Sequence, residues 1–317
     1  MSVSYIDGEI AWTHPDGTLY LAGGDSANCT IAACPVDLSV YGYRPSIAAS
    51  SVLIVLYAIC TCIQVFLGLR YKSWWFMGCM VLGCLDEILG YAGRIMYWQN
   101  PWNDTGFLMQ IVLITIGPVF FAAAVYVLLS QIVTTIAPDR SRFNPKWYVW
   151  TFISCDIVSL VLQAAGGGIS SSSSGSSTTG VDIALAGLSI QVITLFVFVV
   201  IVIDYTIRSR SVWSKSSLPG SFKIFCAGLA IATALILVRC SYRIYELSEG
   251  YSRDSKALRD EPLFIALESV MIVVSAYCLI AAHPGLGFRL MSSATASETS
   301  LSVKSLEKHT VREALSV

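Results

Sequence analysis

Charged residues are scarce in this chain of 317 amino acids, since Asp, Glu, Lys and Arg together make up only 13% of it. Apolar residues make up 55%, and the mean hydropathy is +0.66. A soluble protein of this size needs more polar residues to cover its surface, so lipid is the expected solvent for most of the chain. The formal net charge is −1, and the basic residues form short clusters between apolar runs. This distribution excludes nucleic acid as a partner.

Histidine is almost missing, because the chain holds only His14, His283 and His309. None of them lies deep inside an apolar segment. A membrane hydrolase or desaturase needs a cluster of such ligands, so the sequence predicts no metal site and no enzyme of this kind. A glycine-rich phosphate loop, and a soluble domain to carry one, are also missing, so neither a nucleotide nor another cofactor is expected.

The ten cysteines do not form the framework of a secreted domain. Eight of them lie inside apolar segments, where we expect small buried side chains rather than metal or redox chemistry: Cys60, Cys62, Cys79, Cys84, Cys155, Cys226, Cys240 and Cys278. Cys29 and Cys34 lie instead in the polar N-terminal region. If that region is outside the cytosol, the two thiols either form one small disulfide loop or remain free.

Long apolar windows dominate the middle of the chain. A helix needs about 20 apolar residues to cross a hydrocarbon core about 30 Å thick. Seven windows meet this requirement: 46–69, 74–97, 107–134, 148–169, 181–206, 221–244 and 262–283. The sequence therefore predicts an all-α fold, a bundle of seven transmembrane helices.

Basic residues indicate the orientation of this bundle. Twelve Lys and Arg residues fall in the segments on one side of the predicted helices and four on the other, and the richer side is expected in the cytosol. The two glycosylation sequons, which begin at Asn28 and Asn103, both fall on the opposite side. We therefore expect the N-terminus outside and the C-terminus in the cytosol, with Asn28 glycosylated and Asn103 too close to the membrane.

Three regions follow from this orientation. Residues 1–45 are an outer tail, residues 46–285 are the transmembrane domain, and residues 286–317 are a cytosolic tail rich in Ser and Thr that we expect to be disordered. The run of Ser, Thr and Gly at 170–180 cannot bury apolar surface, so it is expected to be a flexible outer loop.

Polar residues inside the windows mark the candidate site. A charged side chain at a helix centre costs about 2.5 to 3.5 kcal/mol, so these groups should pair with one another or line a cavity. Within each helix their spacing places them on one face. The candidate substrate-binding residues are Glu87, Tyr91, Arg94, Asp156, Ser159, Gln163, Gln191, Arg239, Tyr242, Arg243, Glu246 and Glu268.

Counting residues from the outer helix ends places many of these groups at similar depths. Residues Tyr91, Gln163, Arg239 and Glu268 fall about 8 to 10 Å below the outer surface. Glu87 falls at about 15 Å, close to Pro118, which breaks the third helix and frees a carbonyl one turn back.

Two interpretations of this polar layer remain open. The residues either hold the bundle together as interhelical pairs, such as Arg239 with Glu268 and Arg94 with Glu87, or line an acid-rich pocket that faces the outer leaflet. When Asp86 of the second helix is counted with the set, carboxylates outnumber arginines by two, which favours a pocket that accepts a cationic head group or a proton. The carboxylates are Asp86, Glu87, Asp156, Glu246 and Glu268, and the arginines are Arg94, Arg239 and Arg243. Neutralisation of a buried carboxyl group is equally compatible with that surplus.

The same residues resemble those of the fungal RTA-like family of lipid-translocating exporters, over about residues 46–285. The motifs that carry the resemblance are Glu87-x-x-Gly90-Tyr91-x-x-Arg94, Pro118-x-Phe120-x-Ala122-Ala123-x-x-Tyr126, Asp156-x-x-Ser159-x-x-x-Gln163 with Gly166-Gly167-Gly168, Gly187-Leu188-x-x-Gln191, Arg239-x-x-Tyr242-Arg243-x-x-Glu246, and His283-Pro284-Gly285. Three positions depart from the family pattern: Gln131 replaces an Arg, Glu268 replaces an Asp, and Ile265 replaces an aromatic residue.

The resemblance implies export or leaflet-to-leaflet movement of amphipathic lipids, of which sphingoid long-chain bases are the best-known class, and resistance to membrane-active toxic compounds. It equally implies porphyrin or haem passage as an alternative. The expected partners are membrane lipids and a cationic amphipathic small molecule, in the plasma membrane or else in the endoplasmic reticulum or vacuolar membrane. A seven-helix lipid sensor or receptor has the same layout and stays open as a second function.

Overall fold

The computed structural model describes residues 2–6, 9–14, 16–22, 28–136, 145–172, 178–215, 220–249 and 259–287. Within these ranges seven helical spans are long and apolar enough to cross a membrane, as the sequence predicts. The helices are α1 (Ile47–Tyr71), α2 (Trp74–Gln99), α3 (Asp104–Ile136), α4 (Pro145–Ser172), α5 (Thr178–Lys215), α6 (Gly220–Ser248), and a last span made of α8 (Glu261–Phe264), η3 (Ile265–Val270) and α9 (Met271–Ala281).

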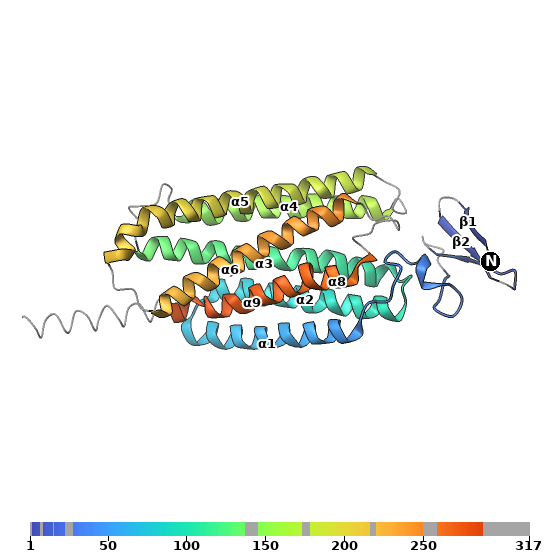
Figure 1. Cartoon of the computed structure of the whole chain (residues 1–317), viewed down its shortest axis with the longest axis horizontal. Helices are drawn as coiled ribbons and strands as arrows, with labels where there is room; N and C mark the ends of the chain where they lie inside the picture. The colour runs from blue at the N-terminus through green and yellow to red at the C-terminus, as the bar shows by residue number, and fades with distance from the viewer. Residues whose placement is uncertain are drawn as a thin grey trace, which may run out of the picture.

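The helices run side by side along the long axis of the molecule (Figure 1). Each packs against its neighbour in chain order, and α9 returns to pack against α1. Helix α3 contacts α2, α4 and α6, and its apolar window is the most deeply buried of the seven. It is therefore the central helix of the bundle. We call the end at which α1 begins the N-side and the opposite end the C-side.

Local signals fix several helix ends. The hydroxyl of Ser46 accepts a hydrogen bond from the backbone N–H of Ala49 and begins α1. Lys72 ends the same helix with a left-handed backbone, at a φ of 56°. The carboxylate of Asp260 accepts from the N–H of Leu263 at 3.1 Å and begins α8.

Two parts of the chain differ from the expected regions. The N-terminal region, expected to be a tail, contains an antiparallel sheet of strands β1 (Ser2–Ile6), β2 (Glu9–Thr13) and β3 (Leu19–Leu21). Helices α4 and α5 take up part of the serine-rich run, since α4 ends at Ser172 and α5 begins at Thr178. Residues 288–317, most of the expected C-terminal tail, lie outside the described residues.

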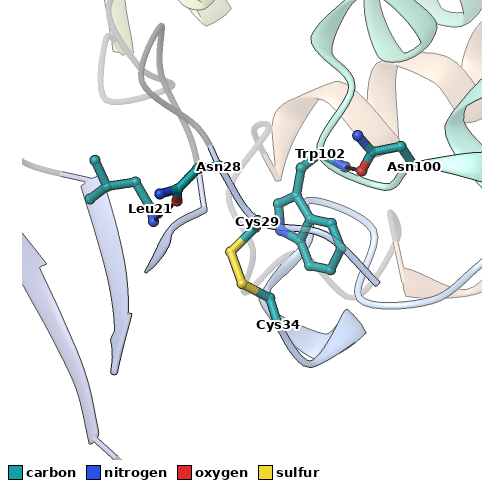
Figure 2. The surroundings of a disulfide bond; sticks show 6 residues. All are labelled: Leu21, Asn28, Cys29, Cys34, Asn100 and Trp102. Carbon is teal, nitrogen blue, oxygen red and sulfur yellow. Dashed lines mark hydrogen bonds between the residues drawn. A yellow bond between two sulfur atoms is a disulfide. The ribbon is translucent and has the colours of Figure 1, made fainter. Parts of the chain in front are cut away.

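Cys29 and Cys34 are joined by a disulfide, with their Cα atoms 5.6 Å apart. The disulfide packs against Trp102, in the turn between α2 and α3 (Figure 2). Beside it, the side-chain oxygen of Asn28 accepts from the N–H of Leu21 at 2.7 Å. The loop that carries the predicted glycosylation site is thus attached both to the sheet and to the helix bundle.

Candidate functional site

A buried ion pair between α6 and η3 forms the centre of the polar layer. Arg239 donates through Nη2 to the carboxylate of Glu268, and both side chains are buried. The same Nη2 donates at 2.8 Å to the carbonyl oxygen of Ile114 in α3. In an α-helix the backbone N–H of residue 118 would donate to that carbonyl, but residue 118 is a proline and has no N–H. Helix α3 continues through Pro118, so the expected helix break is wrong and only one backbone hydrogen bond is lost. The carbonyl that this loss frees lets one guanidinium group connect α3, α6 and η3.

The last span reaches this centre through a turn of π-helix. In η3 the backbone turn holds one residue more than an α-helical turn, and such turns are frequent at functional sites. Both Glu268 and Ser269 lie in it and point into the bundle, where each is at most 1% exposed. The π turn therefore supplies the carboxylate that holds Arg239.

Glu87, in the middle of α2, is the unpaired carboxylate of this layer. Its side chain is 1% exposed, and neither carboxylate oxygen has a hydrogen-bond partner among the described residues. It lies against Gly117 of α3, where an added Cβ would stand 2.8 Å from its Oε1. The glycine leaves space for the carboxyl group but supplies no donor to it.

Two stacked tyrosines lie next to Glu87. The rings of Tyr57 in α1 and Tyr91 in α2 are 6.1 Å apart and nearly parallel. Both hydroxyl groups are buried: that of Tyr57 has no hydrogen-bond partner among the described residues, and that of Tyr91 faces Ser269 of η3. Glu87 acts electrostatically on both tyrosines. Arg239 and Glu268 are also close enough to act on Glu87. Four of the candidate residues and Tyr57 thus lie close together here, from four helical elements.

Arg94, two turns nearer the N-side than Glu87, pairs with Glu261 rather than with Glu87. Its Nη2 donates to Glu261 at 3.4 Å and to the hydroxyl of Tyr43 at 3.1 Å. Its guanidinium lies 4.3 Å from the ring centre of Phe264. Glu261 also accepts from the backbone N–H of Ser46 at 2.7 Å. The pair connects α2, α8 and the segment that precedes α1.

That segment, residues 36–46, covers the N-side of the bundle, and we call it the N-side cover. Tyr41 accepts from the side-chain amide of Gln110 in α3 at 2.9 Å, and Arg44 donates to the carbonyl of Trp98 in α2 at 3.0 Å. Burial raises the pKa of Tyr43 although the neighbouring Arg94 opposes the shift. Tyr43 therefore keeps its proton at neutral pH and accepts the Arg94 bond as a neutral phenol.

The polar residues of α4 and α5 bond to one another. Gln163 donates to the Ser159 hydroxyl at 2.8 Å and to the side-chain oxygen of Gln191 at 3.1 Å. Ser159 donates to the carbonyl of Gly187 at 2.6 Å. We call this set the α4–α5 seam. Its groups satisfy one another, as interhelical polar groups in membranes commonly do.

Other candidates lie apart from Glu87. Asp156 of α4 faces the hydroxyl of Tyr126 in α3. In α6, Arg243 pairs with Glu246 within the same helix and contacts Thr115 of α3 at 3.3 Å. Tyr242 lies on the same stretch of α6, within electrostatic reach of Glu246 and Glu268.

An apolar groove of about 460 Å³ runs between α1 and α9. The hydroxyl of Tyr277 spans it and donates to the carbonyl of Leu56 at 3.0 Å. Leu56 directly precedes Tyr57, and Val273 of the groove lies one turn after Ser269. The groove therefore begins at a depth along the helices similar to that of Tyr57 and Ser269. Its lining is Leu56, Val273, Val274, Tyr277, Cys278 and Ala281.

The His283-Pro284-Gly285 motif belongs to the C-side. The backbone N–H of Gly285 donates to Nδ1 of His283 at 3.1 Å, so Nε2 carries the ring proton and donates to the hydroxyl of Ser73. Gly285 lies against Tyr71, with no space for a side chain. The motif fastens the end of the last span to the turn between α1 and α2.

Sequence reasoning missed Tyr57, Tyr43 and Ser269 as members of the site. For Tyr57 a signal exists, because the buried residues of α1 recur at three- and four-residue spacing: Ser50, Leu53, Tyr57, Cys60, Gln64 and Gly68. For Tyr43 and Ser269 no such signal exists, because one precedes its helix and the other depends on the π turn.

Seven apolar spans around a buried polar layer define an integral membrane protein of the polytopic helical class. The chain belongs to the RTA1-like family: the family model described as "RTA1 like protein" matches residues 80–291. This finding confirms the resemblance that the sequence motifs indicate. No solved structure matches the chain.

Three curated relatives come from Saccharomyces cerevisiae. "Sphingoid long-chain base transporter RSB1" is 29% identical over 290 residues, which cover 79% of this chain and 75% of the relative. "Protoporphyrin uptake protein 1" is 30% identical over 54% of this chain and 56% of its own length. "Protein RTM1" is 28% identical over 63% of this chain and 65% of its own length. The first two names support a lipid-transporter function for the family to which this chain belongs.

Proposed function

We propose that this protein moves single-chain amphipathic lipids with a cationic head group, of the sphingoid long-chain-base kind, between the leaflets of its membrane. The observation that carries the proposal is the pairing of the carboxylates around the polar layer. Glu261, Glu268 and Glu246 each have an arginine partner, whereas Glu87 has none among the described residues. Asp156 also lacks an arginine among the described residues, but it faces the hydroxyl of Tyr126. Glu87 is therefore the carboxylate that we assign to an external cation.

The chemistry of an ammonium head group suits this position. It offers a positive charge and up to three N–H donors, and a carboxylate accepts charge-assisted hydrogen bonds of this kind. The hydroxyls of Tyr57 and Tyr91 are further acceptors within the same buried volume. The alkyl chain of the lipid has a matching surface in the apolar groove between α1 and α9.

The orientation of the chain is part of the proposal. The excess of Lys and Arg on the C-side favours a cytosolic C-side. A disulfide between Cys29 and Cys34 is typical of an oxidising compartment and supports an N-side outside the cytosol. We place the protein in the plasma membrane, where outward movement of toxic amphiphiles gives resistance, and we assign it no enzymatic step.

A transport assay with the purified protein in sealed vesicles tests this function. The probe is a labelled long-chain amine, and the measurement is the fraction of probe that a membrane-impermeant quencher reaches over time. We expect faster exchange between leaflets than in protein-free vesicles, and no acceleration for an N-acylated analogue that has the same chain but a neutral head group. If the protein accelerates neither probe, the transporter proposal is wrong and the sensor alternative gains support.

A further inference from the structure

We propose that Glu87 is a proton-binding site and that the protein exchanges this proton for the cationic head group of the lipid, one for one. The inference rests on the proposed function, because the lipid is the partner in the exchange. It adds a coupling ion, a stoichiometry and a direction: lipid moves one way while a proton moves the other way.

The surroundings of Glu87 supply the first argument. Its side chain is 1% exposed, no described residue donates a hydrogen bond to its carboxyl group, and that group occupies the space that Gly117 leaves. An ionised carboxylate without donors is strongly unfavourable in an apolar interior. The geometry therefore fits a neutral carboxylic acid when no lipid is bound. A proton bound to the carboxylate of Glu87 is the smallest cation that makes this group neutral.

The charge balance of the layer supplies the second argument. The groups that act on Glu87 are Tyr57 from α1, Cys84, Asp86 and Tyr91 from α2, Arg239 from α6, and Glu268 from η3. The only cation among these groups is Arg239, and its Nη2 already holds Glu268 and the carbonyl of Ile114. Two buried carboxylates thus share one guanidinium, which leaves one negative charge to be neutralised.

One proton or one ammonium group satisfies that balance equally well, but both together do not. When the head group enters, the carboxyl proton of Glu87 is released to water on the side of entry, and the ammonium takes over its charge. When the head group leaves on the opposite side, a proton from that side returns to the carboxylate. No covalent bond to carbon forms or breaks, and the charge inside the layer stays constant. The exchange is therefore electroneutral.

The test uses full-length protein in sealed vesicles with a single-chain quaternary ammonium amphiphile. This probe cannot cross as a neutral base, so a pH gradient moves it only through coupled transport. A trapped pH dye reports protons, and a potassium gradient with an ionophore sets the membrane potential. We expect the pH gradient to drive the probe at one proton per molecule and the membrane potential to have no effect on the rate.

Variants of two neighbouring carboxylates test which group binds the proton. Glu87→Gln is expected to abolish proton movement, whereas Asp86→Asn, the same chemical change at the neighbouring half-buried carboxylate, is expected to keep it. Glu87→Asp retains the acid and is expected to keep coupled exchange at a lower rate, which shows that the site tolerates substitution. The infrared band of a buried protonated carboxyl group should disappear in Glu87→Gln and persist in Asp86→Asn.

The possible failures are distinct. Probe movement without proton movement overturns the coupling and leaves the proposed function in place. Coupled movement that survives in Glu87→Gln shows that another group binds the proton. The absence of protein-dependent movement of both this probe and the long-chain amine overturns the coupling and the proposed function together, whereas movement of the amine alone overturns only the coupling as proposed.

Discussion

The guanidinium group of Arg239 donates to the carbonyl oxygen of Ile114 at 2.8 Å. A helix break in a membrane leaves a carbonyl group that must find another donor. Here the donor is a charged side chain that also holds Glu268. Helix α3 runs through Pro118 without a break, and the carbonyl that the proline frees is bonded by the protein itself. We therefore assign the cation-accepting role to Glu87 instead.

This relationship predicts a large effect of Arg239→Ala. The variant leaves Glu268 buried without its cation, so we expect the free energy of unfolding to fall by about 3 to 5 kcal/mol. Thermal unfolding in detergent measures this loss.

Pro118→Ala provides the second half of the test. It restores the backbone N–H that bonds the Ile114 carbonyl, so Arg239→Ala should cost about 1 kcal/mol less in this background. An equal cost in both backgrounds would show that the carbonyl contact contributes nothing.

A second prediction concerns the N-side cover. Glu261→Gln keeps an oxygen that accepts from Ser46 but removes the charge that holds Arg94. We expect about tenfold faster amide hydrogen exchange in residues 41–46, since a charge-assisted hydrogen bond is lost. Asp182→Asn, on the exposed face of α5, is the control and should change nothing. Unchanged exchange in Glu261→Gln would mean that Arg94 does not hold the cover.

The three consecutive glycines of α4 offer a third prediction with a matched control. A Cβ at Gly166 would stand 2.5 Å from backbone atoms of α5, whereas a Cβ at Gly167 would meet nothing within 4 Å. We expect Gly166→Ala to lower the free energy of unfolding by about 1 to 3 kcal/mol through overpacking, and Gly167→Ala to be neutral or slightly stabilising. Equal thermal stability of the two variants would contradict the close contact between α4 and α5.

The fourth prediction tests the orientation of the chain. If the N-side lies outside the cytosol, Asn28 carries a glycan, and glycosidase treatment should increase the gel mobility of the protein. Thr30→Ala removes the sequon but keeps the backbone bonds that the Thr30 carbonyl accepts from Ala33 and Cys34, so this variant should run at the deglycosylated position without treatment. A glycan on an asparagine introduced into the C-terminal tail, with none on Asn28, would reverse the assigned orientation.

Hydrophobicity and helical spacing predicted the seven spans and the faces of α2 and α6 that turn inward. They did not predict partners across the bundle. Arg94 and Glu87 lie on one face of α2, yet Arg94 pairs with Glu261 of another helix. Such pairs depend on how the helices tilt and on where the N-side cover lies. The spacing of residues within one helix predicts neither.

Depth alone was also an incomplete guide to the candidate site. Gln163 and Tyr91 have similar predicted depths, but Gln163 bonds within the α4–α5 seam while Tyr91 stacks on Tyr57. Counting residues gives a position along a helix and says nothing of its lateral place in the bundle. The extra residue of η3, which sets the register of Glu268, leaves no pattern in the sequence.

The rate at which variants move a cationic single-chain amphiphile in sealed vesicles tests the central role of Glu87 most directly. Glu87→Gln removes the charge and nearly preserves the shape, so it should lower the initial rate at least about tenfold, while Asp86→Asn should stay close to the unmodified protein. If Glu87→Gln moves the amphiphile at the unmodified rate, the buried carboxylate does not receive the head group.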